Sequence, residues 1–284
     1  MKYQPRSVIL LYLLLFIASL STDAQTILVT DTIINNTTWS ADTVKVMGDV
    51  TIAKDIILSI EPGTHVEFQG HYKIVVLGTI NAVGSLEQPI RFTIDDTTGF
   101  SNIETKLGGW NGIRFQETTF SSYDTEFRHC IFEYGKATDG DAGTEVQEDH
   151  GGAIYIYQCY EEVVIDSCIF KNCQAQWNGG AICLRSGYST LIQNCTLVDN
   201  QSYNGGAIYS SQSYDLNIIG NNISNNNAEY GGAILLSTSE GYFLKTPRHL
   251  DTSTLRYISW LRQEFTNLIQ KGSFKQYQAD ESKR

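Results

Sequence analysis

The tetrapeptide Gly-Gly-Ala-Ile occurs four times in this sequence, at residues 151–154, 179–182, 205–208 and 231–234. Successive copies begin 28, 26 and 26 residues apart. A fixed period of this length is typical of solenoids, propellers and other repeat arrays. The repeats therefore bear on the fold class before any other feature of the chain.

A second element precedes the later copies, as Cys-Ile-Phe-Lys-Asn-Cys at 168–173, Cys-Thr-Leu-Val-Asp-Asn at 195–200 and Asn-Asn-Ile-Ser-Asn-Asn at 221–226. Each repeat holds about three short strand-like runs separated by Asn, Gly or Ser turns. None contains a helical pattern, which excludes leucine-rich, tetratricopeptide and ankyrin arrays. We predict an all-β fold: a single-stranded right-handed parallel β-helix of eight or nine coils stacked at about 4.8 Å, with a short C-terminal helix.

The repeat positions have structural interpretations. Within each tetrapeptide, Ile is expected to point into the core and Ala outward, because neighbouring strand residues face opposite ways. Asn200 and Asn226 are expected to adopt left-handed geometry in a turn and to bond to the next coil. The cysteines Cys130, Cys168 and Cys195 share one site and predict a stack of buried thiols; disulfides between coils are the alternative. Paired glycines are expected at corners that need positive φ or close backbone approach, at Gly151, Gly152, Gly179, Gly180, Gly205, Gly206, Gly231 and Gly232.

The ends of the chain differ from the repeats. Residues 1–24 have the charge, apolar run and small residues of a secretory signal peptide cleaved after Ala24, and the run is too short for a membrane span. The β-helix is expected over 25–240 and a tail over 241–284. Residues 250–270 of the tail have the pattern of an amphipathic helix, either a cap on the stack or the remnant of a truncated gene. We expect a secreted or cell-surface protein with no transmembrane segment in its mature form.

The chain is acidic, with a formal net charge of −11. This charge disfavours nucleic acid and is compatible with divalent cations or neutral glycans. Five carboxylates cluster on a Gly-containing loop at residues 139–149. Oxygen ligands on such a loop suit Ca²⁺, so we predict a calcium site, and a solvated acidic loop without a metal is the alternative. The carboxylates concerned are Asp139, Asp141, Glu145, Glu148 and Asp149.

The N-terminal half carries a resemblance to known proteins. Its segments Leu-Ser-Ile-Glu-Pro-Gly at 58–63 and Gly-Trp-Asn-Gly-Ile-Arg-Phe at 109–115 resemble the opening of secreted bacterial right-handed β-helix proteins of the pectate-lyase-like superfamily. The Gly-Gly-Ala-Ile repeat looks like that of polymorphic outer-membrane proteins. The first resemblance implies a β-helix, and the second implies a surface adhesin.

Catalytic patterns are weak. Asp95-Asp96 is the only adjacent aspartate pair and is equally well explained as a turn. His150 occupies a turn position that later repeats fill with Asn178, Asn204 and Tyr230.

Aromatic residues indicate a binding surface, because side chains on successive coils can form a ladder that stacks on sugar rings or adheres to another surface. The alternative is that tyrosines only cover strand surfaces, where their β-propensity favours them. The candidate ligand-binding residues are Tyr155, Tyr157, Trp177, Tyr203, Tyr209 and Tyr230; Tyr160, Tyr188 and Tyr214 belong to the same cluster.

From these features we predict a monomeric, non-catalytic binding or adhesion protein whose partner is a glycan or a host or cell-surface component. The alternative is a polysaccharide lyase or glycoside hydrolase, active or degenerate.

Overall fold

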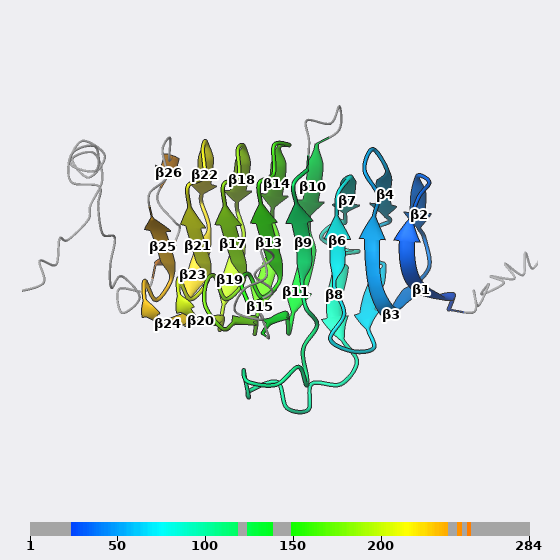
Figure 1. Cartoon of the computed structure of the whole chain (residues 1–284), viewed down its shortest axis with the longest axis horizontal. Coiled ribbons are helices and arrows are strands. Elements are labelled where there is room, and N and C mark those ends of the chain that lie inside the picture. The colour runs from blue at the N-terminus through cyan, green and yellow to red at the C-terminus, as the bar shows by residue number, and fades with distance from the viewer. Residues whose placement is uncertain (1–23, 119–123, 139–148, 238–242, 246–248, 251–284) are drawn as a thin grey trace, which may run out of the picture.

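The structure is a computed structural model that describes residues 24–118, 124–138, 149–237, 243–245 and 249–250. All regular elements in these residues are β-strands, and every pairing between them is parallel. The chain winds in successive coils that stack along one axis, as Figure 1 shows. The predicted parallel β-helix is therefore confirmed for this part of the chain.

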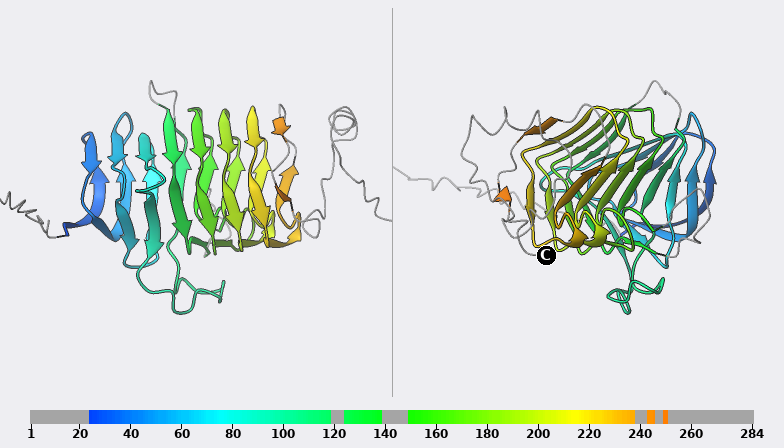
Figure 2. Two further views of the ribbon diagram at one scale, coloured as in Figure 1. Left: turned by 180° about the vertical axis from the view of Figure 1, so that it is seen from behind. Right: turned by 60° about the vertical axis from the view of Figure 1, so that its left-hand side comes forward.

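Each coil contributes strands to three long faces and, in its later turns, to a short fourth sheet (Figure 2). The first face contains β6 (Ile74–Val76), β9 (Ile113–Gln116), β13 (Ile154–Tyr157), β17 (Ile182–Arg185), β21 (Ile208–Ser211) and β25 (Ile234–Ser237). The second contains β5 (His65–Phe68), β8 (Ile90–Ile94), β11 (Cys130–Glu133), β15 (Ile169–Lys171), β19 (Thr196–Val198), β23 (Asn222–Ser224) and β27 (His249–Leu250). The long strand β3 (Thr43–Ile52) pairs with β5, β6 and the first strand, β1 (Thr26–Ile33), and so joins these two faces.

Within the described residues the third face has eight strands, which agrees with the predicted eight or nine coils. They are β2 (Thr37–Trp39), β4 (Ile57–Ile60), β7 (Thr79–Val83), β10 (Thr125–Arg128), β14 (Val163–Asp166), β18 (Thr190–Gln193), β22 (Leu216–Ile219) and β26 (Phe243–Lys245). The short sheet contains β12 (Lys136–Ala137), β16 (Gln174–Ala175), β20 (Gln201–Asn204) and β24 (Asn227–Tyr230). Because β26 and β27 pair with β22 and β23, the stack extends past the predicted boundary at residue 240. The predicted C-terminal helix and signal peptide lie outside the described residues.

The tetrapeptides stack in register, with Ile154 paired to Ile182, Ile182 to Ile208 and Ile208 to Ile234. The first three isoleucines are completely buried, as predicted. The outward orientation expected for the alanines is wrong, since Ala153, Ala181, Ala207 and Ala233 are buried in the same core. Each alanine precedes its strand, so it lies in the corner, where strand alternation does not apply.

Both glycines of the tetrapeptide meet backbone requirements. The first has a left-handed backbone in all four copies, with φ of 63° at Gly151 and 64° at Gly179. The second lies against the next coil: a Cβ on Gly180 would stand 2.2 Å from the carbonyl oxygen of Gly206. A side chain at the second position would therefore force neighbouring coils apart, whereas one at the first would meet the backbone of its own coil, as at Gly151, where a Cβ would stand 2.3 Å from the carbonyl oxygen of Ile154.

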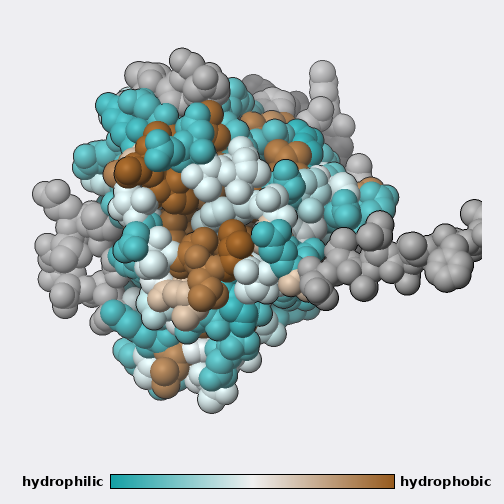
Figure 3. Space-filling view, turned by 90° about the vertical axis from the view of Figure 1, so that its right-hand side faces the viewer, coloured by the Kyte–Doolittle hydropathy of each residue, from teal (hydrophilic) through white to brown (hydrophobic). Residues whose placement is uncertain are grey.

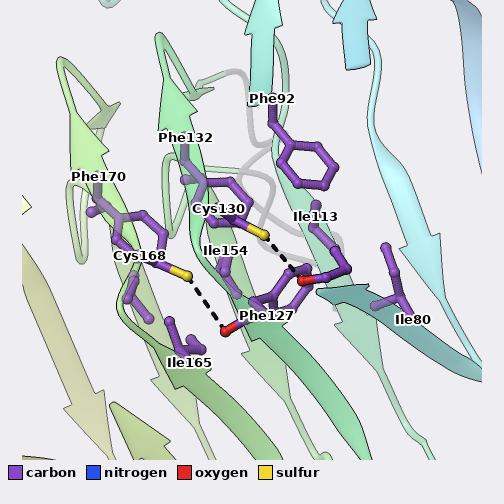
Figure 4. Close-up of a cluster of buried hydrophobic side chains, with 14 of the residues drawn as sticks. Ile80, Phe92, Ile113, Phe127, Cys130, Phe132, Ile154, Ile165, Cys168 and Phe170 are labelled. Atoms are coloured by element: carbon purple, nitrogen blue, oxygen red, sulfur yellow. Dashed lines mark hydrogen bonds between the residues drawn. The ribbon is translucent and has the colours of Figure 1, made fainter. Parts of the chain in front are cut away.

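The cysteine stack is confirmed as free, buried thiols. The Sγ atoms of Cys130 and Cys168 donate hydrogen bonds of 3.2 and 3.4 Å to carbonyl oxygens of Ala82 and Phe127 on the preceding coil (Figure 4). One such bond recurs at Cys195, and at Asn221 in the following coil the side-chain amide makes it. This position therefore requires a small side chain that donates a hydrogen bond to a backbone carbonyl of the preceding coil. Beside it, the rings of Phe92, Phe132 and Phe170 stack nearly parallel, with centroids 4.8 and 4.6 Å apart.

Asn200 and Asn226 bond between coils as predicted, but the expected left-handed geometry is wrong for both. The positive φ belongs instead to the residue before each, Asp199 and Asn225. This placement turns the buried amide inward, where the Oδ1 of Asn200 accepts the Cys173 N–H and that of Asn226 accepts the Asn200 N–H, at 2.9 Å each.

The N-terminal end of the stack is only partly covered. The outer edge of β1 has no paired strand among the described residues, and Leu28 is 68% exposed. Ile27, Val29 and Ile33 pack on the core from this first coil but are only partly buried. Figure 3 views this end and shows apolar surface between polar margins, as expected where a stack begins.

Candidate functional site

The predicted calcium loop falls mainly outside the described residues, which include only Asp149 of its five carboxylates. The Asp149 Oδ1 lies 3.3 Å from the Nδ1 of His150, and both side chains are largely buried. Burial raises the pKa of Asp149. No cluster of three or more His, Cys, Asp or Glu side chains with metal-binding geometry occurs in the described part of the chain. The calcium site remains a prediction.

His150 is part of a buried polar corner rather than an open site. Its carbonyl oxygen accepts a hydrogen bond from the buried guanidinium of Arg114, which also donates to the carbonyl of Gly151 at 2.8 Å. Burial, with Arg185 and Arg114 nearby, lowers the pKa of His150 to about 3. Its backbone pairs with Asn178, as expected for a repeat-turn residue.

The adjacent aspartates form a turn, as one of the two interpretations expected. The Asp96 Oδ1 accepts the Thr98 N–H at 2.8 Å, and these hydrogen bonds lower the pKa of Asp96. Such an Asx turn orders the backbone where the 95–108 segment leaves β8.

Tyr155 does not lie on an exposed aromatic surface, so this part of the prediction is wrong. Its ring is fully buried, 5.9 Å from the Arg114 guanidinium and 6.1 Å from the ring of Tyr157. Tyr157 and Tyr209 are partly buried. The corner that carries His150 covers this end of the first face.

Trp177, Tyr203 and Tyr230 do form an exposed row, one ring per coil. They are 46%, 42% and 43% exposed, and neighbouring centroids lie 5.4 and 5.5 Å apart. Neighbouring planes meet at 71° and 66°, so the row is not a flat platform. A hydrogen bond with the Tyr230 side chain raises the pKa of Tyr203 and links the two hydroxyl groups.

A second row contains Tyr160, Tyr188 and Tyr214. Their centroids lie 4.6 and 5.3 Å apart, with interplanar angles near 30°. Neighbouring rings of this row are therefore closer to parallel than those of the first row.

A groove of about 300 Å³ lies over the short sheet, next to the first aromatic row. Three amide side chains share one register position along its floor: Gln174 pairs with Gln201, and Gln201 pairs with Asn227. Tyr203 and Glu229 also line it. The sequence analysis named Tyr203 and Tyr230 but missed the amides, because Gln and Asn at these positions look like ordinary turn residues.

One wall of the groove comes from residues 95–108, here named the 95–108 loop, which follows β8 and contributes Ile103. Figure 1 shows this segment projecting from the edge of the stack that carries β20 and β24. The fully buried Lys136 holds the loop, since its ammonium donates to the carbonyl oxygens of Asn102 at 2.7 Å, Leu107 at 2.8 Å and Gly99 at 3.3 Å. Desolvation lowers the pKa of Lys136 to about 8. No sequence signal separates this lysine from a solvent-exposed one.

Comparison with known families agrees with the fold. A family model described as the right-handed beta helix region matches residues 139–245. The fold is a right-handed parallel β-helix. No curated protein and no solved structure matched the chain.

The described lining of the groove contains few charged side chains. Among its described lining residues, Glu229 is the single carboxylate, and neither Lys nor Arg is present. Paired carboxylates at set distances are what glycoside hydrolysis requires.

No helix in the described part of the chain has the length and apolar character needed to cross a membrane.

Proposed function

We propose that this β-helix is a secreted or surface-associated, non-catalytic protein that binds neutral glycans in the groove above the short sheet. The observation that carries the proposal is the in-register pair of exposed amides, Gln201 and Asn227, beside the exposed ring of Tyr203. Primary amides both donate and accept hydrogen bonds, which suits sugar hydroxyls, and an aromatic ring suits the apolar face of a sugar.

The charge of the protein favours a neutral ligand. The net charge of −11 and the carboxylate of Glu229 would repel uronates, and the described lining offers no cation to neutralise them. The signal-peptide pattern and the resemblance of the repeats to those of surface adhesins favour export. A cell-surface glycan is the partner that these features fit together.

The test is affinity electrophoresis and calorimetry of the protein against soluble glucans, xylans and mannans. Tyr203→Ala and Gln201→Ala should each weaken binding about tenfold, which corresponds to roughly 1.4 kcal/mol. Tyr188→Ala is the matched control, because Tyr188 is 40% exposed but lies in the other aromatic row. Equal losses in the control, or no binding to any neutral glycan, would contradict the proposed site.

The same samples decide between binding and catalysis. Reducing ends and unsaturated products are measured after prolonged incubation with each glycan, with Ca²⁺ and with EDTA. We expect no turnover above the blank. Turnover that Glu229→Gln abolishes would replace the binding function with a hydrolase or lyase.

A further inference from the structure

We infer that the groove is closed at one end and therefore recognises the end of a glycan chain rather than its interior; this inference rests on the proposed function. Gln174, Gln201 and Asn227 occupy equivalent positions, yet Gln174 is only 6% exposed while the other two are open to solvent. The cause is the 95–108 loop, whose Phe100 carbonyl accepts a hydrogen bond from the Gln174 side-chain amide. The amide row is thus covered on its β16 side.

The wall that closes the groove is firmly held. Besides the three carbonyls that bind Lys136, the hydroxyl of Thr138 donates to the carbonyl oxygen of Ile103 itself. The ring of Phe100 packs edge-on against Tyr134, with centroids 5.3 Å apart. These contacts fix the loop to β12 and its flanking residues, so a ligand would have to displace several hydrogen bonds to pass Ile103.

The groove runs along the stacking axis. Its floor crosses β16, β20 and β24, and successive coils lie about 4.8 Å apart, so a chain that follows the axis meets the exposed amides of Asn227 and Gln201 one coil apart. At Gln201 and Asn227 the floor is open. At Ile103 the path ends. A polysaccharide can therefore enter with a terminal sugar against Ile103, whereas an internal stretch would meet the wall.

The experiment compares chain ends with chain interiors. The experiment measures displacement of a labelled hexasaccharide from the protein. The short competitors are cellohexaose, xylohexaose and mannohexaose, and the polymers, used at equal mass, are hydroxyethylcellulose, arabinoxylan and galactomannan. Because polymers carry far fewer ends per mass, we expect each polymer to compete at least tenfold more weakly than the hexasaccharide of its backbone. A polymer that competes as well per mass as the hexasaccharide overturns the inference but leaves the proposed function standing. No binding of any probe overturns the proposed function itself.

Variants of the wall test the cause. Ile103→Ser and Lys136→Met should raise polymer competition severalfold towards the hexasaccharide value, because the first lowers the wall and the second releases it. Leu107→Ser is the matched control, since Leu107 belongs to the same loop, is 64% exposed and does not line the groove. Melting curves show whether Lys136→Met folds; if it does not, Ile103→Ser decides. A ratio unchanged in Ile103→Ser overturns the inference.

Discussion

Asn200→Ala tests the role of the asparagine ladder in holding neighbouring coils together. The buried Asn200 side chain accepts the Cys173 N–H at 2.9 Å and donates to the Phe170 carbonyl at 3.1 Å and the Asn226 Oδ1 at 2.9 Å. Alanine leaves the Cys173 N–H buried without its acceptor, which costs about 1–3 kcal/mol, and removes two further bonds worth about 1 kcal/mol each. The backbone N–H of residue 200 keeps its acceptor, the Asn226 Oδ1, so the hydrogen bonding between these two coils is only partly lost. We expect a destabilisation of about 3 kcal/mol.

The assay is thermal and urea unfolding followed by far-ultraviolet circular dichroism. For a folded region of this size, about 3 kcal/mol corresponds to a melting temperature lower by roughly 6–12 °C. Asn222→Ala is the matched control, because Asn222 is exposed on β23, and it should change stability by less than about 0.5 kcal/mol. Cys173→Asn places the amide at the same site one coil earlier and should be tolerated. An Asn200→Ala protein that melts within about 1 °C of the wild type would refute the reasoning.

Three further predictions concern buried residues of the stack. Gly180→Ala should lower the free energy of unfolding by about 3 kcal/mol or more, because the added Cβ would meet backbone atoms. Gly187→Ala is the control, since a Cβ there has its nearest neighbour at 3.4 Å, and it should cost less than about 1 kcal/mol. Urea unfolding measures both. His150 has a pKa of about 3 when folded and about 6.5 when unfolded, so only the unfolded state gains the proton as pH falls below 6.5. Stability should then drop by about 3 kcal/mol between pH 6.5 and 4, and His150→Asn should flatten this dependence in melting curves; an unchanged slope would count against it. The six buried thiols should resist a thiol reagent in the native protein and react fully in guanidinium; burial raises the pKa of Cys173, for example, to about 12.

The repeat pattern predicted most of the fold. The nearly constant spacing of the tetrapeptides predicted the register in which Ile154 pairs with Ile182, because stacked coils place equivalent residues of the repeat side by side. The shared site of Cys130, Cys168 and Cys195 likewise predicted a stack of thiols. These predictions succeeded because each depends on the repeat alone.

The errors arose at corners, where periodicity gives no direction for a side chain. Ala153 precedes its strand and turns into the core, although strand alternation would place it outside. Tyr155 does face outward in its strand, but the polar corner of Arg114 and His150 covers it. Whether an outward residue is exposed depends on what packs above it, and that neighbour lies outside the repeat.

The same reasoning explains why the candidate site was only half predicted. A perfect repeat presents the same surface at every coil, so it has no end at which a ligand could be positioned. The 95–108 loop breaks this equivalence: Phe100 reaches Gln174, a residue 74 positions later, and makes one member of the amide row different from the next. The aromatic row could be foreseen from the repeat, whereas the closed end of the groove depends on a contact between distant segments. The specificity of this β-helix should therefore lie in its departures from the repeat, and the repeat itself supplies the rigid scaffold that holds them in place.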